Sequence, residues 1–81
     1  MASVFLNGNL KLFAQGNSEF EINVKNIKQV FEHLVSLYPE LKPHLLEGVA
    51  VAIDGEIYQD AWLEKVYPYS EVHLIPRIGG G

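Results

Sequence analysis

The sequence EVHLIPRIGGG (residues 71–81) is the stretch from which the fold of this chain is inferred. Its largely apolar run Val72-His73-Leu74-Ile75 predicts a strand. Pro76 is expected to end that strand, because proline has no N–H to donate within a sheet. Five residues remain after it, Arg77-Ile78-Gly79-Gly80-Gly81. We therefore expect a last strand that runs directly into a short glycine tail.

The region before this strand predicts a β-hairpin. Val49, Val51 and Ile53 alternate with alanines, which is the period-two pattern of a strand. Asp54-Gly55 is typical of a two-residue hairpin turn, because both residues tolerate a positive φ. Ile57-Tyr58 is expected to begin the return strand.

The connecting segments are less regular. Residues 40–47 predict about one helical turn, closed by Gly48. Trp62 and Leu63 are expected to tuck under the sheet. Pro68-Tyr69-Ser70 predicts a turn just before the last strand.

Residues 26–38 predict one amphipathic helix. Asn26 suits the N-cap, because its side chain can accept a hydrogen bond from an unpaired N–H of the first turn. Pro39 disfavours helical geometry at Tyr38 and is expected to end the helix there. Apolar residues at steps of three and four define the core-facing side, namely Ile27, Val30, Phe31, Leu34 and Leu37.

The N-terminal part predicts two strands. Residues 3–13 are interpreted as one strand, broken at Asn7-Gly8, and Gly16-Asn17 as the following turn. Alternation with polar residues then predicts a half-buried strand whose core-facing side chains are Phe20, Ile22 and Val24.

Together these elements predict an α+β fold in which one main helix covers a mixed sheet of four or five strands. The two terminal strands would be parallel and central, with the helix lying over the connection between them. This order is the ubiquitin-like β-grasp arrangement. At 81 residues the chain is expected to form one such domain over residues 1–76, followed by a flexible glycine tail at residues 77–81.

Composition excludes several classes of function. The net charge is −4, and the six basic residues are scattered, which disfavours nucleic acid and anionic membranes as partners. The sequence has no cysteine, so disulfides, thiolate catalysis and sulfur-ligated zinc are excluded. No signal peptide or apolar stretch of membrane-spanning length is evident, so cytoplasmic residence is expected. A chain this small is more typical of a carrier or binding module than of a self-sufficient enzyme.

The sequence resembles the ubiquitin-like sulfur carriers, which include the small subunit of molybdopterin synthase, the thiamine-biosynthesis carrier and archaeal modifier relatives. The resemblance covers essentially the whole chain. It is carried by YPEL (38–41) with LLE (45–47), by VAIDGE (51–56), and by EVHLIP (71–76) before a terminal diglycine. The chain departs from these carriers at Tyr67-Pro68-Tyr69-Ser70, where they usually have an Asp-Gly-Asp-like turn, and at Arg77-Ile78.

The resemblance implies a chemical role for the tail. The Gly81 carboxylate would be adenylated by a ubiquitin-activating-type enzyme and then converted to a thiocarboxylate for a sulfur acceptor enzyme. ATP and magnesium would belong to that partner, and the carrier itself would bind no cofactor. A protein modifier would instead pass its acyl group to a cysteine and then to a lysine. Glycine suits such a tail because it is narrow and conformationally permissive.

A second resemblance leaves an alternative open. The N-terminal ubiquitin-like domain of lambda-like phage tail-assembly proteins is similar at Gly8-Asn9-Leu10, at Phe13 and at HLIPRIGG (73–80). In that family the chain normally continues past the glycines. On this interpretation the domain is an assembly module that a peptidase processes at or near the glycines (79–81), and Gly81 is a true end or a processed end.

Three further residues are predicted to bind a partner. His73 and Ile75 would point to the sheet face opposite Val72 and Leu74, and Phe5 shares that face in one register. A shift of one residue would bury all three instead. Arg77 would pair with acidic groups of a partner or remain solvated. No metal is expected, since His33, His44 and His73 are widely spaced and have no cysteine beside them.

Overall fold

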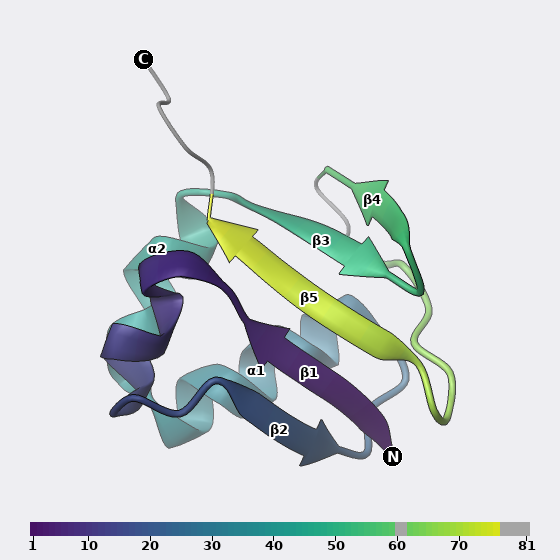
Figure 1. Cartoon of the computed structure of the whole chain (residues 1–81), viewed down its shortest axis with the longest axis horizontal. Coiled ribbons are helices and arrows are strands. Elements are labelled where there is room, and N and C mark those ends of the chain that lie inside the picture. Colours follow the sequence, from purple (N-terminus) through teal and green to yellow (C-terminus); the bar gives the residue numbers. More distant parts are fainter. Residues whose placement is uncertain (60–61, 77–81) are drawn as a thin grey trace.

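A computed structural model describes residues 1–59 and 62–76 of the chain. Its strands form one mixed sheet in the order β2-β1-β5-β3-β4 (Figure 1). The bounds are β1 Ala2–Leu6, β2 Glu19–Ile22, β3 Val49–Ile53, β4 Glu56–Tyr58 and β5 Glu71–Pro76. β1 and β5 are parallel, and the other neighbours are antiparallel. The predicted α+β fold with parallel terminal strands is therefore confirmed.

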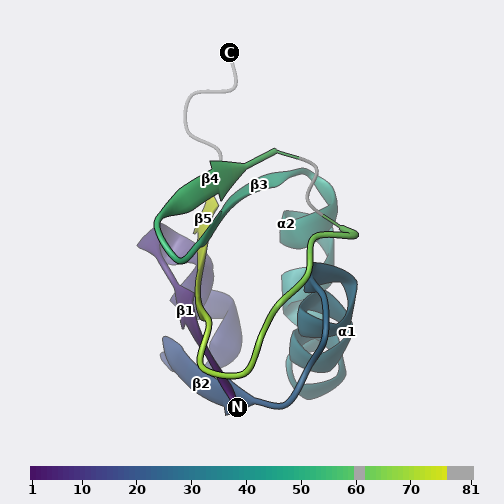
Figure 2. The same ribbon diagram turned by 90° about the vertical axis from the view of Figure 1, so that its right-hand side faces the viewer.

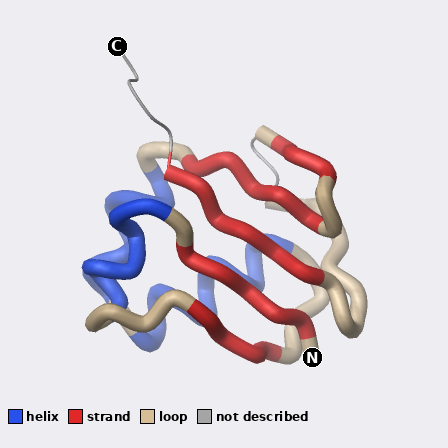
Figure 3. The backbone as a smooth tube through the Cα atoms, in the orientation of Figure 1, coloured by secondary structure: helices blue, strands red, loops and turns tan. Residues whose placement is uncertain are grey.

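The helices pack on one face of this sheet. The main helix α1 (Ile27–Leu37) and the short α2 (Lys42–Leu46) lie on the same side of the sheet, as Figure 2 shows. Figure 3 shows the same arrangement with helices in blue and strands in red. Two 3-10 helices, η1 (Gly8–Ala14) and η2 (Pro39–Leu41), connect the elements. No helix in the described part of the chain is long and apolar enough to cross a membrane.

Alternation along the central strands builds the core. Val4 pairs with Val72 and Leu6 pairs with Leu74 in the parallel β1–β5 ladder, and all four side chains are buried. Because strand side chains alternate between faces, these residues point toward the helices and their neighbours point away. The helix contributes buried Ile27, Val30, Phe31 and Leu34 to the same core.

Asn26 caps α1 as predicted. Its side chain accepts a hydrogen bond of 2.9 Å from the Gln29 backbone N–H, and the Gln29 side chain accepts one of 2.7 Å from the Lys25 N–H. Two backbone donors at the helix start are thereby satisfied by side chains. The helix ends at its C-cap residue Tyr38, immediately before Pro39, as expected.

We expect Asn26→Ala to lower the free energy of unfolding by about 1 kcal/mol, the usual cost of losing an N-cap side chain. Urea titration followed by circular dichroism would measure it. Asn23→Ala is the matched control, because the exposed Asn23 side chain makes no hydrogen bond to a described residue. Equal destabilisation by the two variants would contradict the capping role.

Two expectations about the N-terminal half and the helix are wrong. Residues 8–14 form η1 and do not continue the first strand, because Leu10 and Ala14 are buried four residues apart whereas Leu12 is 68% exposed. This burial has a helical period, and the period-two pattern of a strand is absent. Leu37, expected on the core-facing side of α1, is 50% exposed because it lies in the last turn.

The Trp62-Leu63 segment also differs from its prediction. Trp62 packs on the helix layer, where its ring meets Phe31 edge-on with a centroid separation of 4.8 Å. Leu63 is 83% exposed and does not lie under the sheet. Both residues are apolar, so the sequence alone does not show that Trp62 packs against the helix layer while Leu63 is exposed.

Candidate functional site

The predicted tail residues Arg77, Ile78, Gly79, Gly80 and Gly81 lie outside the described residues, as does the proposed reaction centre at Gly81. Their roles stay predictions. What the structure describes is the point from which the tail starts. Pro76 is the last residue of β5 and pairs with Val49 of β3, so this starting point belongs to a central strand of the sheet.

The Asn7-Gly8 corner holds the end of β5 from the other side. The Asn7 backbone N–H donates to the Leu74 carbonyl oxygen at 3.0 Å, and the Asn7 side-chain amide approaches the same oxygen at 3.4 Å. Gly8 has a φ of +62°, and a Cβ on it would lie 2.8 Å from Pro76 Cγ. Only glycine permits both this conformation and this close approach. Pro76 is therefore enclosed between Gly8 and Val49.

The open face of the sheet carries the three residues that were expected to bind a partner. Phe5 pairs with His73 across β1 and β5, and their rings stack with centroids 4.7 Å apart at an interplanar angle of 12°. Ile75 follows on β5, beside Ala50 of β3. The structure places all three on the face opposite Val72 and Leu74, which looks toward the reader in Figure 1, and each is half-buried.

We define the open face by the outward residues of the sheet. One row crosses the sheet through Cα partners, and it runs Glu19, Phe5, His73, Ala52, Ile57. Ile57 at the edge is 66% exposed. The row has an aromatic centre and an apolar side toward β3 and β4, and exposed aromatic and apolar groups of this kind are common in protein interfaces.

His73 is held in one orientation at the centre of this face. Its Nε2 lies 2.8 Å from Glu71 Oε1, and its Nδ1 lies 3.3 Å from Asn7 Nδ2. The side-chain nitrogen of Asn7 can only donate, so Nδ1 accepts and the Nε2–H donates to the Glu71 carboxylate. Asn7 thus links the aromatic centre to the corner that contacts Pro76.

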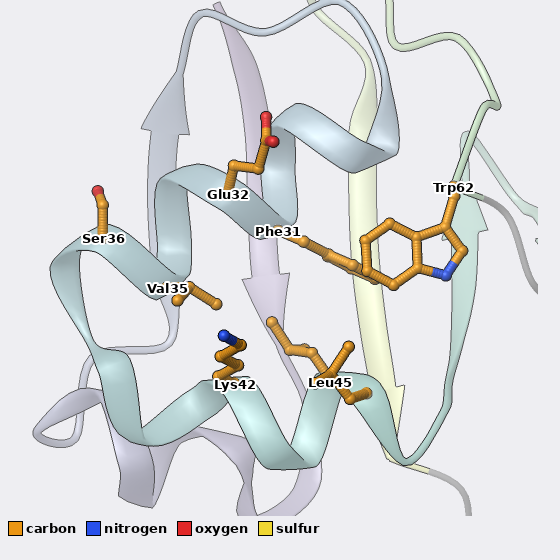
Figure 4. A pocket seen from close by; sticks show the side chains of 8 residues that line it. Phe31, Glu32, Val35, Ser36, Lys42, Leu45 and Trp62 are labelled. Atoms are coloured by element: carbon orange, nitrogen blue, oxygen red, sulfur yellow. The ribbon is translucent and has the colours of Figure 1, made fainter.

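A groove on the helix layer was not predicted from the sequence. It lies between α1 and α2, has a volume of about 360 Å³ and is closed at one end by Trp62 (Figure 4). Its apolar walls come from Phe31, Val35, Leu45, Leu46 and Trp62, and its polar residues are Glu32, Ser36 and Lys42. The groove depends on how α2 packs against α1, which no local pattern specifies.

The histidines do not converge. His33 is exposed on α1, and His44 stacks on Phe13 with centroids 3.8 Å apart. Within residues 1–59 and 62–76, no group of three or more His, Cys, Asp or Glu side chains is placed to hold a metal ion.

The fold and the position of Pro76, from which the tail starts, define the class of protein. A mixed five-stranded sheet with parallel terminal strands, one main helix and a C-terminal glycine segment is a ubiquitin-like β-grasp domain. The model of the ThiS family matches residues 4–81, and the chain belongs to this family. The predicted resemblance to the ubiquitin-like sulfur carriers is thereby confirmed.

Solved structures agree with this fold. A chain in the BexX/CysO complex of Amycolatopsis orientalis matches with a TM-score of 0.84 and 15% identity, over 100% of both chains. Small archaeal modifier protein 1 of Methanosarcina acetivorans matches with a TM-score of 0.82 and 20% identity, over 99% of this chain and 95% of that one.

A third match is a Pyrococcus furiosus protein described as subunit 1 of a molybdopterin converting factor. It has a TM-score of 0.78 and 20% identity, over 95% of this chain and 97% of that one. A search of curated protein sequences gives no match.

Proposed function

We propose that this chain is a sulfur carrier that works through its C-terminal carboxylate and is not itself an enzyme. The observation that supports this most directly is the ThiS family match, which extends through Gly81 and so includes the glycine tail. The enclosed position of Pro76 adds support, because a reactive terminus is useful only if it leaves the domain at a defined place.

The proposed reaction has two steps. A carboxylate oxygen of Gly81 attacks the α-phosphorus of ATP, pyrophosphate leaves, and an acyl-adenylate forms. A hydrosulfide ion then attacks the acyl carbon, AMP leaves, a proton is lost, and the terminus becomes a thiocarboxylate. The partner adenylating enzyme supplies ATP, magnesium and the catalytic groups. The chain supplies a narrow terminus and, having no cysteine, no internal thiol that could attack it.

The open face is the proposed docking surface for that enzyme. Phe5, His73 and Ile75 lie on the same strands that lead to the tail, so docking through them would also orient Pro76. A thiocarboxylate carrier needs a second partner, a sulfur acceptor enzyme.

A protein-modifier role is the second candidate. It is favoured by the structural likeness to small archaeal modifier protein 1, although that likeness by itself concerns the fold. The chemistry is shared up to the adenylate and then diverges, because the acyl group passes to a lysine amine. The phage tail-assembly alternative gains no support from the family match or from the three structures described above.

Intact-mass analysis tests the proposal. The chain would be incubated with ATP, magnesium, the adenylating enzyme encoded in the same genome and a sulfur donor. The expected product is heavier by the replacement of one oxygen with sulfur, located at Gly81 by fragmentation. Covalent addition to lysines of other proteins would favour the modifier role. No mass change, together with a cellular precursor that continues past Gly81, would move the assignment to the assembly role.

We expect Phe5→Ala to weaken docking without unfolding the domain. Phe5 stacks on His73 at the centre of the open face, and removing a central aromatic residue from an interface usually costs about tenfold in affinity or more. The KM of the adenylating enzyme for the carrier should rise while kcat changes little. Leu12→Ala, which removes an exposed side chain of η1, is the control. Equal KM values for the two variants would exclude the open face as the docking surface.

A further inference from the structure

The lysines in the described part of the chain lie away from the open face, whereas three glutamates lie on it. Glu19 and Glu21 of β2 and Glu71 of β5 project on the open face, next to Phe5 and His73. Within their described bounds, β1 to β5 contain no lysine or arginine. The described lysines lie instead in η1, around α1, in α2 and in the loop before β5, at Lys11, Lys25, Lys28, Lys42 and Lys65.

These three carboxylates have no lysine or arginine partner within the described part of the chain. Glu71 Oε1 lies 2.8 Å from His73 Nε2, a hydrogen bond to a histidine ring and not to a lysine or arginine. Glu21 accepts a hydrogen bond of 2.7 Å from the Ser3 hydroxyl, which carries no charge. No lysine of residues 1–59 and 62–76 lies within ion-pair distance of any of the three. Among the residues that the structure describes, the open face therefore presents an aromatic centre bordered by carboxylates that no lysine or arginine pairs with.

We infer that the partner surface for this face has an apolar centre bordered by lysine and arginine side chains that meet Glu19, Glu21 and Glu71. This inference rests on the proposed docking function and names the chemistry of the partner. Opposite potentials across an interface accelerate encounter and select against wrong partners.

The same charges argue against other occupants of the face. A second copy placed face to face would oppose three carboxylates with three more, and like charges across an interface are strongly unfavourable. Nucleic acid and anionic membranes would be repelled for the same reason. The basic surface of another protein is the occupant that remains.

Charge reversal with a matched control tests the inference. The variant Glu19→Lys/Glu21→Lys/Glu71→Lys alters the open face, and Glu32→Lys/Glu40→Lys/Glu47→Lys makes the same change in net charge on exposed glutamates of the helix side. The Kd for the adenylating enzyme would be measured by calorimetry at low and high salt. We expect the open-face variant to bind roughly a hundredfold more weakly at low salt and the helix-side variant to change by less than about threefold.

The salt dependence gives a second readout. Binding of the unaltered chain should weaken as salt rises, because ions screen exposed charges, and Glu19→Gln/Glu21→Gln/Glu71→Gln should lose most of that dependence. Glutamine has nearly the same shape as glutamate, so the glutamine variant can still test the role of the charges if the lysine variant does not fold. Equal effects of the two lysine variants, or salt-independent binding, would overturn the inference.

Failure of this inference can be distinguished from failure of the proposed sulfur-carrier function. Adenylation of the unaltered chain with no effect of charge reversal overturns only the inference about the partner surface. If the enzyme neither binds nor adenylates the chain, a different binding experiment tests the inference. The chain would be titrated with a helical peptide that has leucines on one face and arginines along the borders of that face, and binding would be followed by nuclear magnetic resonance. Shifts at Phe5, His73 and Ala52 with this peptide, and none with its glutamate-bordered counterpart, would support the inference. Identical responses to both peptides would overturn it.

Discussion

A chain that lacks Gly80 and Gly81 is expected to lose adenylation and thiocarboxylate formation completely while its fold remains intact. The family match includes these residues, and the proposed reaction takes place on the carboxylate that they carry. A shortened terminus ends at Gly79, two residues closer to Pro76, and two extended residues span roughly 7 Å. Such a displacement would place the carboxylate too far from the ATP α-phosphate that the full tail reaches. Even a displacement of about 1 Å in an active site can slow a reaction about a hundredfold.

The experiment measures ATP–pyrophosphate exchange with the adenylating enzyme, together with thermal unfolding of the carrier. The shortened chain should show no exchange and an unchanged Tm, because the core of buried residues lies before Pro76. It should still bind the enzyme through Phe5 and His73 and compete with the full chain. Residual exchange at the normal rate would show that the terminal glycines are not the site of chemistry.

The second large effect is expected for Gly8→Ala, which should lower the free energy of unfolding by about 3 kcal/mol. Part of this cost, about 1 kcal/mol, is the left-handed backbone conformation at a φ of +62°. The rest comes from placing a methyl group 2.8 Å from Pro76 Cγ, and overpacking of this kind costs about 1–3 kcal/mol. The proline ring cannot rotate away, because proline fixes its own φ and Pro76 is paired with Val49.

Gly16→Ala is the matched control for this variant. Gly16 has a φ of +84°, and an added Cβ there would have no heavy atom within 4 Å. The control therefore carries the backbone cost alone, and the difference between the two variants measures the contact with Pro76. Urea unfolding of both proteins supplies the comparison. Equal losses of stability would mean that Pro76 gives way without cost.

A double variant locates the contact. If Gly8→Ala acts through the proline ring, Pro76→Ala should partly relieve it, and the two substitutions should be non-additive. Under the proposed function, Gly8→Ala should also raise the KM of the adenylating enzyme for the carrier, since it displaces the residue from which the tail starts. Gly16→Ala should leave that KM unchanged.

Elements with local signals were predicted well. The Asn26 cap, the end of α1 before Pro39 and the alternation of β3 and β5 all depend on interactions within a few residues. The Asp54-Gly55 turn is also local. Both residues have a positive φ, +50° and +90°, as a two-residue hairpin with the twist of a type I′ turn requires.

The errors have a common physical origin. Residues 8–14 are apolar enough for a strand, but Leu10 and Ala14 are buried by elements that come much later in the chain, and the segment becomes helical. Leu63 and Leu37 are exposed although they are apolar. A hydrophobic side chain shows that burial is favourable and does not show which surface is available for it.

The sequence by itself determined the fold class, the single main helix and the hairpin, because periodicity, caps and turn residues act over short distances. Only the tertiary structure decided that Phe5 stacks on His73, that Gly8 encloses Pro76 and that α1 and α2 leave a groove. Each of these contacts depends on the relative placement of separate elements, and two of them depend on the parallel register between the first and last strands. A one-residue change in that register would turn Phe5 toward the core and remove the open face on which the proposed docking depends.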